Sequence, residues 1–202
     1  MNNSVLTERG ESATSLLFRT IAAHQAAVTS FGSQTSRGRL SVQREEREEI
    51  QCQATLVRLL SITEAFCADR LLAEVERIVD RVPHQSLRAV WERSAILATN
   101  SWADQQAAYK EYLGVSLENN DWKSIERLAE ARNAVAHGLG KLTRRQQRNR
   151  QSVVARLNVC GIDVEDGRIL LSGNVLLQAA QTCSQFVHKL DGAIEARPQA
   201  YR

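Results

Sequence analysis

The 202-residue sequence has few residues that interrupt regular secondary structure. It contains only two prolines and ten glycines, and aromatic side chains make up 5% of it. Alanine, leucine, arginine, glutamate and glutamine are abundant instead, and these residues favour helices over strands. The chain also lacks an internal repeat, a phosphate-binding glycine loop and a nucleophilic serine or cysteine motif. These absences argue against repeat proteins, P-loop enzymes and hydrolases with a covalent intermediate.

Cysteine is also scarce, and its positions are dispersed. Cys52, Cys67, Cys160 and Cys183 form no Cys-x-x-Cys pair and have no histidine cluster nearby. This spacing argues against zinc and against a disulfide framework, and it is typical of buried thiols in a reducing cytoplasm. No apolar run approaches the roughly 20 residues that cross a bilayer, and the N-terminus lacks a basic segment followed by an apolar one. We therefore expect a cytoplasmic protein with no metal, no cofactor and no membrane partner.

The remaining composition is that of an ordinary globular protein. Hydrophobic residues make up 43% and charged residues 24% of the chain, and the net charge is +3. That charge is too small to indicate a nucleic-acid partner by itself. A chain of this length can bury one sizeable core. We predict an N-terminal helix and flexible loop over residues 1–40 and a helical domain over residues 41–198.

Hydrophobic periodicity and capping residues predict an all-α antiparallel bundle. Ser101-x-x-Asp104 and Thr143-x-x-Gln146 have the pattern of helix N-termini, while Asp166-Gly167 has that of a hairpin turn. Residues 1–11 are polar and expected to fray, and 32–39 have the composition of a loop. The expected helices span about 12–31, 42–81, 86–99, 101–114, 121–140, 144–159 and 174–196, with a small β-hairpin insertion at 161–172.

Three tryptophans occur at helical spacing among aliphatic residues. Trp91, Trp102 and Trp122 could in principle stack on nucleic-acid bases. In this context they are more simply explained as core side chains.

The stretch from Asp121 to Gly140 carries the residues with the most distinctive chemistry. Asn120 or Asp121 can cap its start, and Gly138 and Gly140 can supply the positive φ angles that end a helix. Its expected apolar stripe contains Arg132 at its centre, which needs a carboxylate partner or a polar cleft. The stripe consists of Ile125, Leu128, Val135 and Ala136, with Trp122 and Ala129 at its edge.

Asn133 and His137 lie four residues apart and are neighbours on this helix. Arg132 and His137 are about 140° apart in ideal geometry, so they converge only through the length of the arginine or a loosening near Gly138. Alanines at positions 129, 131, 134 and 136 leave room for close approach of a backbone or a substrate. A fixed cation, an amide and a titratable imidazole together favour a phosphate site.

Glu64 is the preferred partner of Arg132. It lies between Leu60 and Leu71 in an apolar context, where an unpaired carboxylate would be costly. The alternative is a partly exposed helical glutamate with no specific partner.

The segment RNAVAHGLG, with Arg132-Asn133, three further residues and then His137-Gly138, resembles the signature of the HEPN family (higher eukaryotes and prokaryotes nucleotide-binding). The similarity is closest to HEPN branches of bacterial defence and toxin systems, and it extends loosely over residues 45–195. It implies an antiparallel helical bundle of HEPN type. It also implies a homodimer in which two motifs face a shared cleft and form a composite active site.

The resemblance implies a metal-independent endoribonuclease. The 2′-OH of RNA would attack the adjacent phosphate and give 2′,3′-cyclic phosphate and 5′-OH ends. His137 would act as general acid or base, because an unperturbed imidazole titrates near neutrality. Arg132 would stabilise the charged transition state and Asn133 would hold a phosphate oxygen or orient the histidine. Glu64 completes the candidate catalytic set, since similar proteins often carry an acidic residue in the corresponding helix.

A basic cluster follows the motif within about a dozen residues. Lys141, Arg144, Arg145 and Arg148 lie in or just before the first turns of the helix expected at 144–159. A helix N-terminus and several cations favour an anion, so this cluster is a candidate RNA-binding surface. The alternative is an ordinary solvated helix face.

Three other interpretations remain open at the level of sequence. A non-catalytic HEPN module could bind nucleotide, RNA or a partner protein. Arg132 and His137 could be purely structural, as an ion-pair partner and a helix C-terminal residue. The chain could also be a helical scaffold with no active site. In the nuclease interpretation, similar proteins act as toxins or phage-defence effectors and are restrained by an antitoxin or another regulatory protein.

Overall fold

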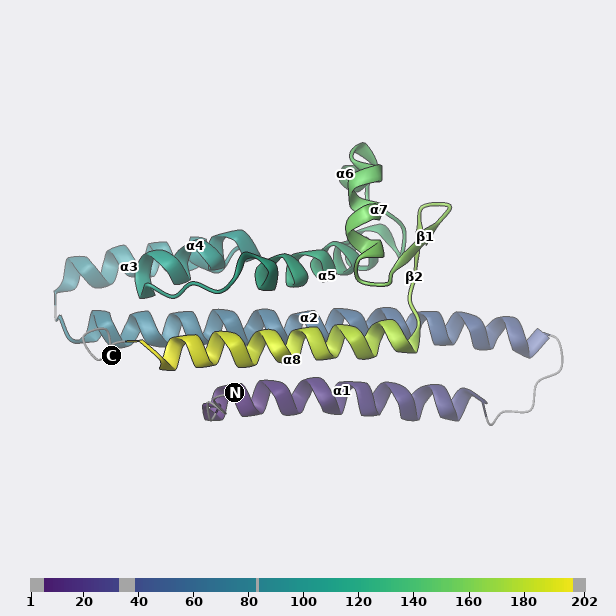
Figure 1. The fold of residues 1–202 in the computed structure, drawn as a ribbon, viewed down its shortest axis with the longest axis horizontal. Coiled ribbons are helices and arrows are strands. Elements are labelled where there is room, and N and C mark those ends of the chain that lie inside the picture. The colour runs from purple at the N-terminus through teal and green to yellow at the C-terminus, as the bar shows by residue number, and fades with distance from the viewer. Residues whose placement is uncertain (1–5, 33–38, 83, 198–202) are drawn as a thin grey trace.

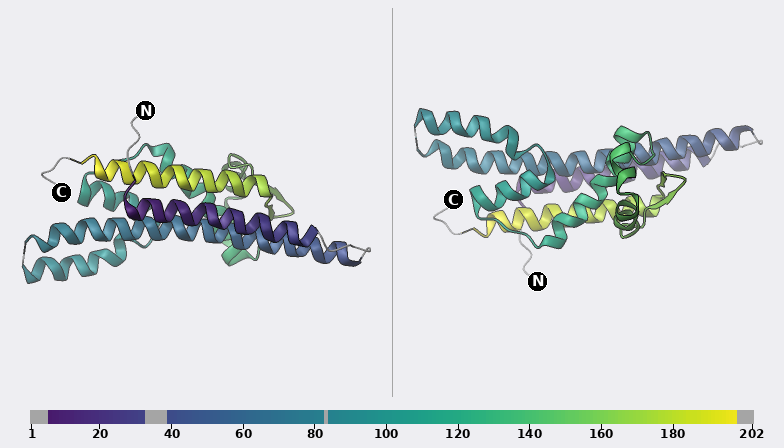
Figure 2. Two further views of the ribbon diagram at one scale, coloured as in Figure 1. Left: turned by 90° about the horizontal axis from the view of Figure 1, so that it is seen from below. Right: turned by 90° about the horizontal axis from the view of Figure 1, so that it is seen from above.

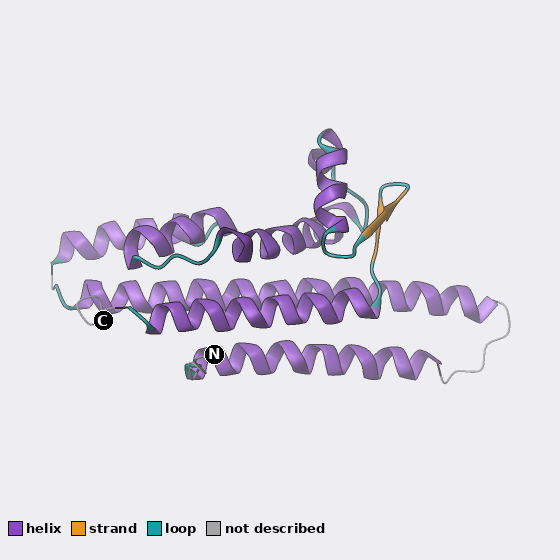
Figure 3. Ribbon diagram, viewed as in Figure 1, coloured by secondary structure: helices purple, strands orange, loops and turns teal. Residues whose placement is uncertain are grey.

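The fold is all-α apart from one small hairpin, as predicted. A computed structural model describes residues 6–32, 39–82 and 84–197. Within this part of the chain the elements, in order, are α1 (Glu8–Gly32), α2 (Arg39–Asp80), α3 (Gln85–Ala98), α4 (Trp102–Leu113), α5 (Asn119–Gly138), α6 (Arg144–Arg148), α7 (Arg150–Asn158), β1 (Asp163–Glu165), β2 (Arg168–Leu170) and α8 (Gly173–Glu195). The two strands are the only sheet among these elements (Figure 3).

The long helix α2 is the axis of the bundle. α8 lies alongside α2, α1 packs on one side of this pair, and α3, α4 and α5 cover the other (Figures 1 and 2). α6, α7 and the hairpin gather at the C-terminal end of α5. No helix in the described part of the chain is both long and apolar enough to cross a membrane.

One hydrophobic core joins these helices. Leu17 of α1, Leu56 of α2, Ile125 of α5 and Leu176 of α8 are all fully buried within it. α1 therefore contributes to the same core as the later helices, and the division of the chain near residue 40 stays a prediction. Burial of this apolar surface is the main driving force for association of the helices.

The tryptophans belong to the core, which confirms their assignment. Trp91, Trp102 and Trp122 are between 2% and 8% exposed. Trp122 and Phe186 pack edge to face with ring centroids 4.9 Å apart.

The four cysteines are free thiols. Burial raises the pKa of Cys183 to about 11, so this thiol stays protonated and unreactive at neutral pH.

Most predicted helix ends and the hairpin turn are confirmed. The Ser101 hydroxyl accepts the N–H of Asp104, and Gly114 ends α4 in the left-handed conformation. Thr143 and Gln146 form the expected capping box. Asp166 and Gly167 have φ angles of 48° and 79° in the turn between β1 and β2.

Several predicted details of α5 and of the helix after it are wrong. α5 has Glu118 at its N-cap instead of Asn120 or Asp121, and its left-handed end residue is Leu139 instead of Gly138. The predicted positive φ of Gly140 is confirmed, at 83°. The helix expected at 144–159 is interrupted at Asn149, which separates α6 from α7. The loop expected at 32–39 falls mostly on residues 33–38, outside the described residues, and Arg39 already begins α2.

The buried face of α5 also differs from the predicted stripe. Ala136 is exposed and Val135 is only half-buried, whereas Ala131 and Ala134 are fully buried. The face rotates along the helix because α5 packs against α2, α4 and α8 and, in addition, against α7. The tertiary partners, which the periodicity alone does not specify, therefore decide which residues are covered.

A buried network of charges connects α2 with α8. Arg70 forms ion pairs with Glu74, Asp191 and Glu195 at 2.8, 3.0 and 2.7 Å. Glu74 also pairs with Arg197, which follows α8. Asp191 in turn accepts the backbone N–H and the hydroxyl of Thr7, just before α1.

Glu74 makes the stability of this network depend on pH. Burial alone would raise the pKa of Glu74, but the hydrogen bond from Arg197 and the charges of Arg70, Arg197 and Arg77 outweigh it, and the pKa is lowered from its ordinary value of 4.5. A lowered folded-state pKa means that the stabilisation is present above pH 4.5 and is lost as pH falls through the folded value.

Glu74→Gln should therefore destabilise the protein at pH 7 by about 3 kcal/mol, because Arg70 and Arg197 lose a buried carboxylate partner. It should also flatten the loss of stability on acidification from about pH 5 to 3. Urea denaturation at pH 7 measures the loss of stability, and a series from about pH 5 to 3 measures its pH dependence. Glu76→Gln, a substitution of an exposed neighbour, is the control. An unchanged pH dependence in Glu74→Gln would assign the acid sensitivity to other carboxylates.

Candidate active site

The predicted partner of Arg132 is confirmed. Arg132 Nη2 of α5 lies 2.8 Å from Glu64 Oε2 of α2, and the two side chains are 23% and 32% exposed. The Nε of Arg132 is buried and has no hydrogen-bond partner among the described residues. The carboxylate therefore engages one terminal nitrogen of the guanidinium, while the buried Nε is closed to a ligand in this arrangement.

This ion pair contributes to the packing of α5 on α2. A half-buried pair with good geometry has a coupling energy of about 1 kcal/mol. Glu64→Ala should destabilise the fold by about 1–3 kcal/mol, since it leaves a partly buried cation without its carboxylate. Urea denaturation of Glu64→Ala, Arg132→Ala and the double variant gives the coupling energy. Strictly additive effects of the two substitutions would mean that the pair adds nothing to the fold.

Asn133 and His137 meet in a different place, at the junction of α5 with α6 and α7. They line a cavity of about 520 Å³, called here the His137 cavity, together with Arg145 of α6 and Arg156 of α7. The His137 side chain is exposed. In the described part of the chain no group forms a hydrogen bond with its ring, so both ring nitrogens are available to a ligand.

Arg132 and Glu64 are not among the described residues that line the His137 cavity. The reason is the regular geometry of α5, which continues as a helix through Gly138. Five residues of an α-helix rotate the side chain by about 140°. Arg132 accordingly faces α2, whereas His137 faces α6 and α7. One chain thus brings together Asn133, His137 and Arg145, but not the arginine and the histidine of the motif.

Gln146 determines the shape of the His137 cavity. Its side-chain amide donates to the backbone carbonyl of Glu130 at 2.8 Å and to the Glu130 carboxylate at 2.9 Å. Arg156 donates to the same carboxylate at 2.8 Å. Glu130 therefore holds both α6 and α7 against α5. The capping-box pattern identified Gln146 as a capping residue, but no local pattern predicted its contacts with Glu130 or the break at Asn149.

The predicted basic cluster is only partly directed toward the motif. Lys141, Arg144, Arg145 and Arg148 are all exposed, and of these only Arg145 lines the His137 cavity. The hydroxyl of Thr143 already accepts the N–H of Gln146 at the start of the five-residue α6. The cationic side chains, and not the end of this short helix, are therefore what α6 offers to an anion.

A neighbouring cavity of about 680 Å³ extends along α5 to the start of α4. It shares four residues with the His137 cavity and adds three charged residues of α5. The shared residues are Glu130, Asn133, Arg145 and Arg156, and the added ones are Lys123, Glu126 and Arg127. Sequence reasoning missed Lys123, Arg127 and Arg156. Lys123 and Arg127 lie four residues apart on the same helix as the motif. That spacing could have identified these two residues.

Comparison with protein-family models, curated proteins and solved structures finds no match to this chain. Among the described residues, no group of three or more histidine, cysteine, aspartate or glutamate side chains is arranged to hold a metal ion. The chemistry of the site must therefore be inferred from its own side chains.

Proposed function

We propose that the protein is a metal-independent endoribonuclease of HEPN type. The observation that carries the proposal is the exposed His137, which shares a cavity with Asn133 and Arg145 and has no partner of its own in the described part of the chain. A proton carrier, an amide and a cation around one cavity suit in-line attack by a neighbouring hydroxyl on a phosphodiester. RNA supplies that hydroxyl as its 2′-OH.

The proton transfers are assigned to the imidazole. His137 takes the proton from the 2′-OH while water protonates the leaving 5′-oxygen, or the imidazolium protonates the leaving 5′-oxygen while water takes the 2′-OH proton. In either case the P–O bond to the 5′-oxygen breaks and the bond to the 2′-oxygen forms. Asn133 and Arg145 donate hydrogen bonds to the non-bridging oxygens. The products are a 2′,3′-cyclic phosphate and a 5′-OH.

Arg132 enters this mechanism only through a second copy of the chain. Because Arg132 and His137 face different neighbours within one chain, a two-fold homodimer is needed to place the arginine of one copy at the histidine of the other. The proposed active site is thus composite, and a monomeric protein would lack Arg132 beside His137.

The decisive assay incubates the purified protein with end-labelled RNA in EDTA and maps the termini. Cleavage that gives cyclic phosphate and 5′-OH ends supports the nuclease. Products with 5′-phosphate ends, or activity that appears only when a divalent metal is restored, would contradict the proposed mechanism.

A non-catalytic HEPN module that binds RNA, nucleotide or a partner protein is the second candidate. It is favoured by the position of Arg132, whose guanidinium is engaged by Glu64 away from the His137 cavity. Saturable RNA binding without any cleavage in the same assay would support this function. In either case the biological role as a toxin or defence effector, and control by an antitoxin or regulatory protein, stay proposals.

A further inference from the structure

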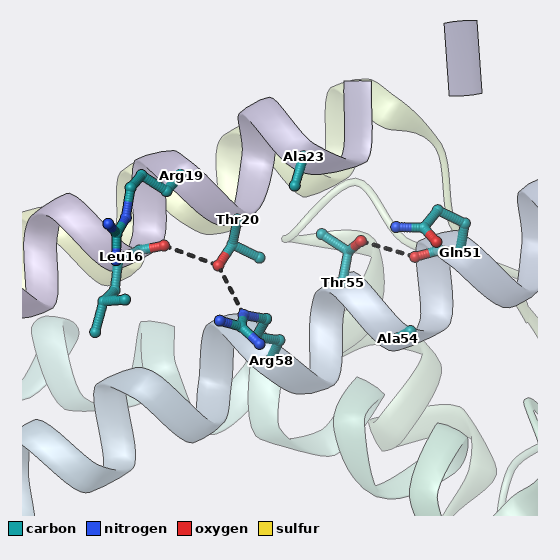
Figure 4. Close-up of a pocket in the computed structure, with 8 residues that line it drawn as sticks. All are labelled: Leu16, Arg19, Thr20, Ala23, Gln51, Ala54, Thr55 and Arg58. Carbon is teal, nitrogen blue, oxygen red and sulfur yellow. Dashed lines mark hydrogen bonds between the residues drawn. The ribbon is translucent and has the colours of Figure 1, made fainter. Parts of the chain in front are cut away.

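A third cavity lies between α1 and α2, on elements that contribute nothing to the His137 cavity. Its volume is about 420 Å³, and we call it the α1–α2 cavity. Its polar lining consists of Arg19 and Thr20 of α1 with Gln51, Thr55 and Arg58 of α2 (Figure 4). A volume of this order is typical of sites for small molecules.

The lining carries positive charge that no carboxylate balances. Among the described residues that line the α1–α2 cavity, none is aspartate or glutamate. Neither Arg19 nor Arg58 forms an ion pair within residues 6–32, 39–82 and 84–197, although many other arginines there are paired, such as Arg9, Arg44, Arg88 and Arg168. Two unpaired guanidinium groups at one cavity favour an anionic ligand.

Arg58 is oriented by a specific contact. Its Nε donates to the Thr20 hydroxyl oxygen at 3.2 Å, across the gap between the two helices (Figure 4). The Thr20 hydroxyl proton is itself donated to the backbone carbonyl of Leu16 at 2.8 Å. Thr20 therefore presents only a lone pair to Arg58. Holding the guanidinium through Nε leaves its two terminal nitrogens free for a bidentate contact with an oxyanion.

The arginines are the only cationic groups of the described cavity lining that can bind an oxyanion. The Thr55 hydroxyl donates to the backbone carbonyl of Gln51 at 2.7 Å and lies 3.2 Å from His24 Nδ1. Burial lowers the pKa of His24, although its bond to the Gln51 backbone opposes this. The imidazole is therefore neutral at pH 7, and the cationic groups of the site are the two arginines.

An apolar surface, called here the Ile62–Phe66 shelf, extends from Arg58. A cavity of about 500 Å³ shares Leu16 and Arg58 with the α1–α2 cavity, and its surface is mainly formed by apolar side chains such as Ile62, Ala65 and Phe66. Its far end carries the Arg9–Asp69 ion pair, at 2.7 Å. A ligand seated on Arg58 can therefore place an apolar body on this shelf.

We propose that the α1–α2 cavity binds a phosphate monoester whose apolar body lies on the Ile62–Phe66 shelf. A phosphate monoester carries about −1.5 to −2 charges at pH 7 and several acceptor oxygens, which match two guanidinium groups. A carboxylate would balance only one of them. This site is separate from the proposed nuclease site and does not depend on its activity.

Isothermal titration calorimetry with phenyl phosphate tests the proposal on the whole protein. We expect saturable binding with a dissociation constant of about 1 mM or lower. Inorganic phosphate should bind more weakly because it lacks the apolar body, and phenylacetate more weakly because it carries a single charge. Benzyl alcohol carries no charge and should not displace phenyl phosphate. Absence of saturable binding, or equal affinity for phenyl phosphate and phenylacetate, would overturn the assignment.

Two variants locate the site. Arg58→Ala should weaken phenyl phosphate binding about 10- to 100-fold, as expected for loss of hydrogen bonds from a charged donor. Thr20→Val keeps both positive charges but releases the Arg58 guanidinium, and it should weaken binding by a smaller factor. Arg93→Ala on α3 removes one exposed positive charge outside the cavity and serves as the matched control.

The three variants separate a built site from general surface charge. Equal weakening by Arg58→Ala and Arg93→Ala would show that only the net charge matters, and it would refute the site. Unchanged binding in Thr20→Val would refute the orienting role of that hydroxyl. Circular dichroism of each variant establishes that the bundle is retained, and Thr20→Val carries the test should Arg58→Ala fail to fold.

Discussion

His137→Ala should lower RNA cleavage in EDTA by about 10²–10⁴-fold, the usual contribution of one general acid or base. The fold should be retained, because the His137 side chain is exposed and forms no hydrogen bond in the described part of the chain. The substitution therefore removes the proton carrier and leaves Asn133 and Arg145 in place. Single-turnover cleavage of end-labelled RNA measures the loss.

His188→Ala is the matched control, since His188 is an exposed histidine on α8 that does not line the His137 cavity. It should cleave RNA at the wild-type rate. RNA binding measured with a 2′-deoxy substitute at the cleavage position should be similar in the wild type and both variants. Full cleavage by His137→Ala would remove the imidazole from the mechanism and with it the main support for the nuclease.

Co-expression of Arg132→Ala with His137→Ala should restore activity that neither variant has alone. If Arg132 of one copy serves His137 of the other, each mixed dimer contains one intact composite site. Random pairing makes half of the dimers mixed, so about a quarter of the wild-type activity should return. The expected result depends on the separation of the two side chains, one facing α2 and the other facing α6 and α7.

Differently tagged copies allow purification of the mixed dimer, and sedimentation velocity establishes its stoichiometry. The control pairs His137→Ala with Asn133→Ala, both of which alter the same cavity. That pair should regain no activity if Asn133 and His137 act from one chain. Mixed Arg132→Ala and His137→Ala dimers that stay inactive would contradict an arginine supplied by the second copy, whereas full cleavage by Arg132→Ala alone would place the arginine outside the chemistry.

Local patterns predicted the elements of this fold well. Ser101 with Asp104, Thr143 with Gln146, and Asp166 with Gly167 specify helix starts and a turn through contacts within a few residues. These contacts do not depend on the rest of the molecule. The pairing of Glu64 with Arg132 was also predictable, because two charges in apolar surroundings need one another.

The arrangement around His137 was not predictable in the same way. The break at Asn149 and the left-handed Leu139 turn α6 and α7 back over α5. Only then do Glu130, Gln146 and Arg156 come together. That Arg19 and Arg58 line one cavity could not be predicted either, because their proximity follows from the way α1 packs on α2. Such contacts between distant segments have no signature in periodicity or capping.

The charge network around Arg70 also governs how the bundle opens. Asp191 holds the backbone at Thr7, Glu74 holds Arg197, and Arg70 lies between the two carboxylates. Release of the chain at Thr7 would remove the hydrogen bonds that position the Asp191 carboxylate. The ion pair of Asp191 with Arg70 would weaken, and with it the position of Arg70 beside Glu74. Fraying of the first turn of α1 and of the last turn of α8 should thus occur together as one cooperative unit, and amide hydrogens in both turns should exchange with solvent at matching rates.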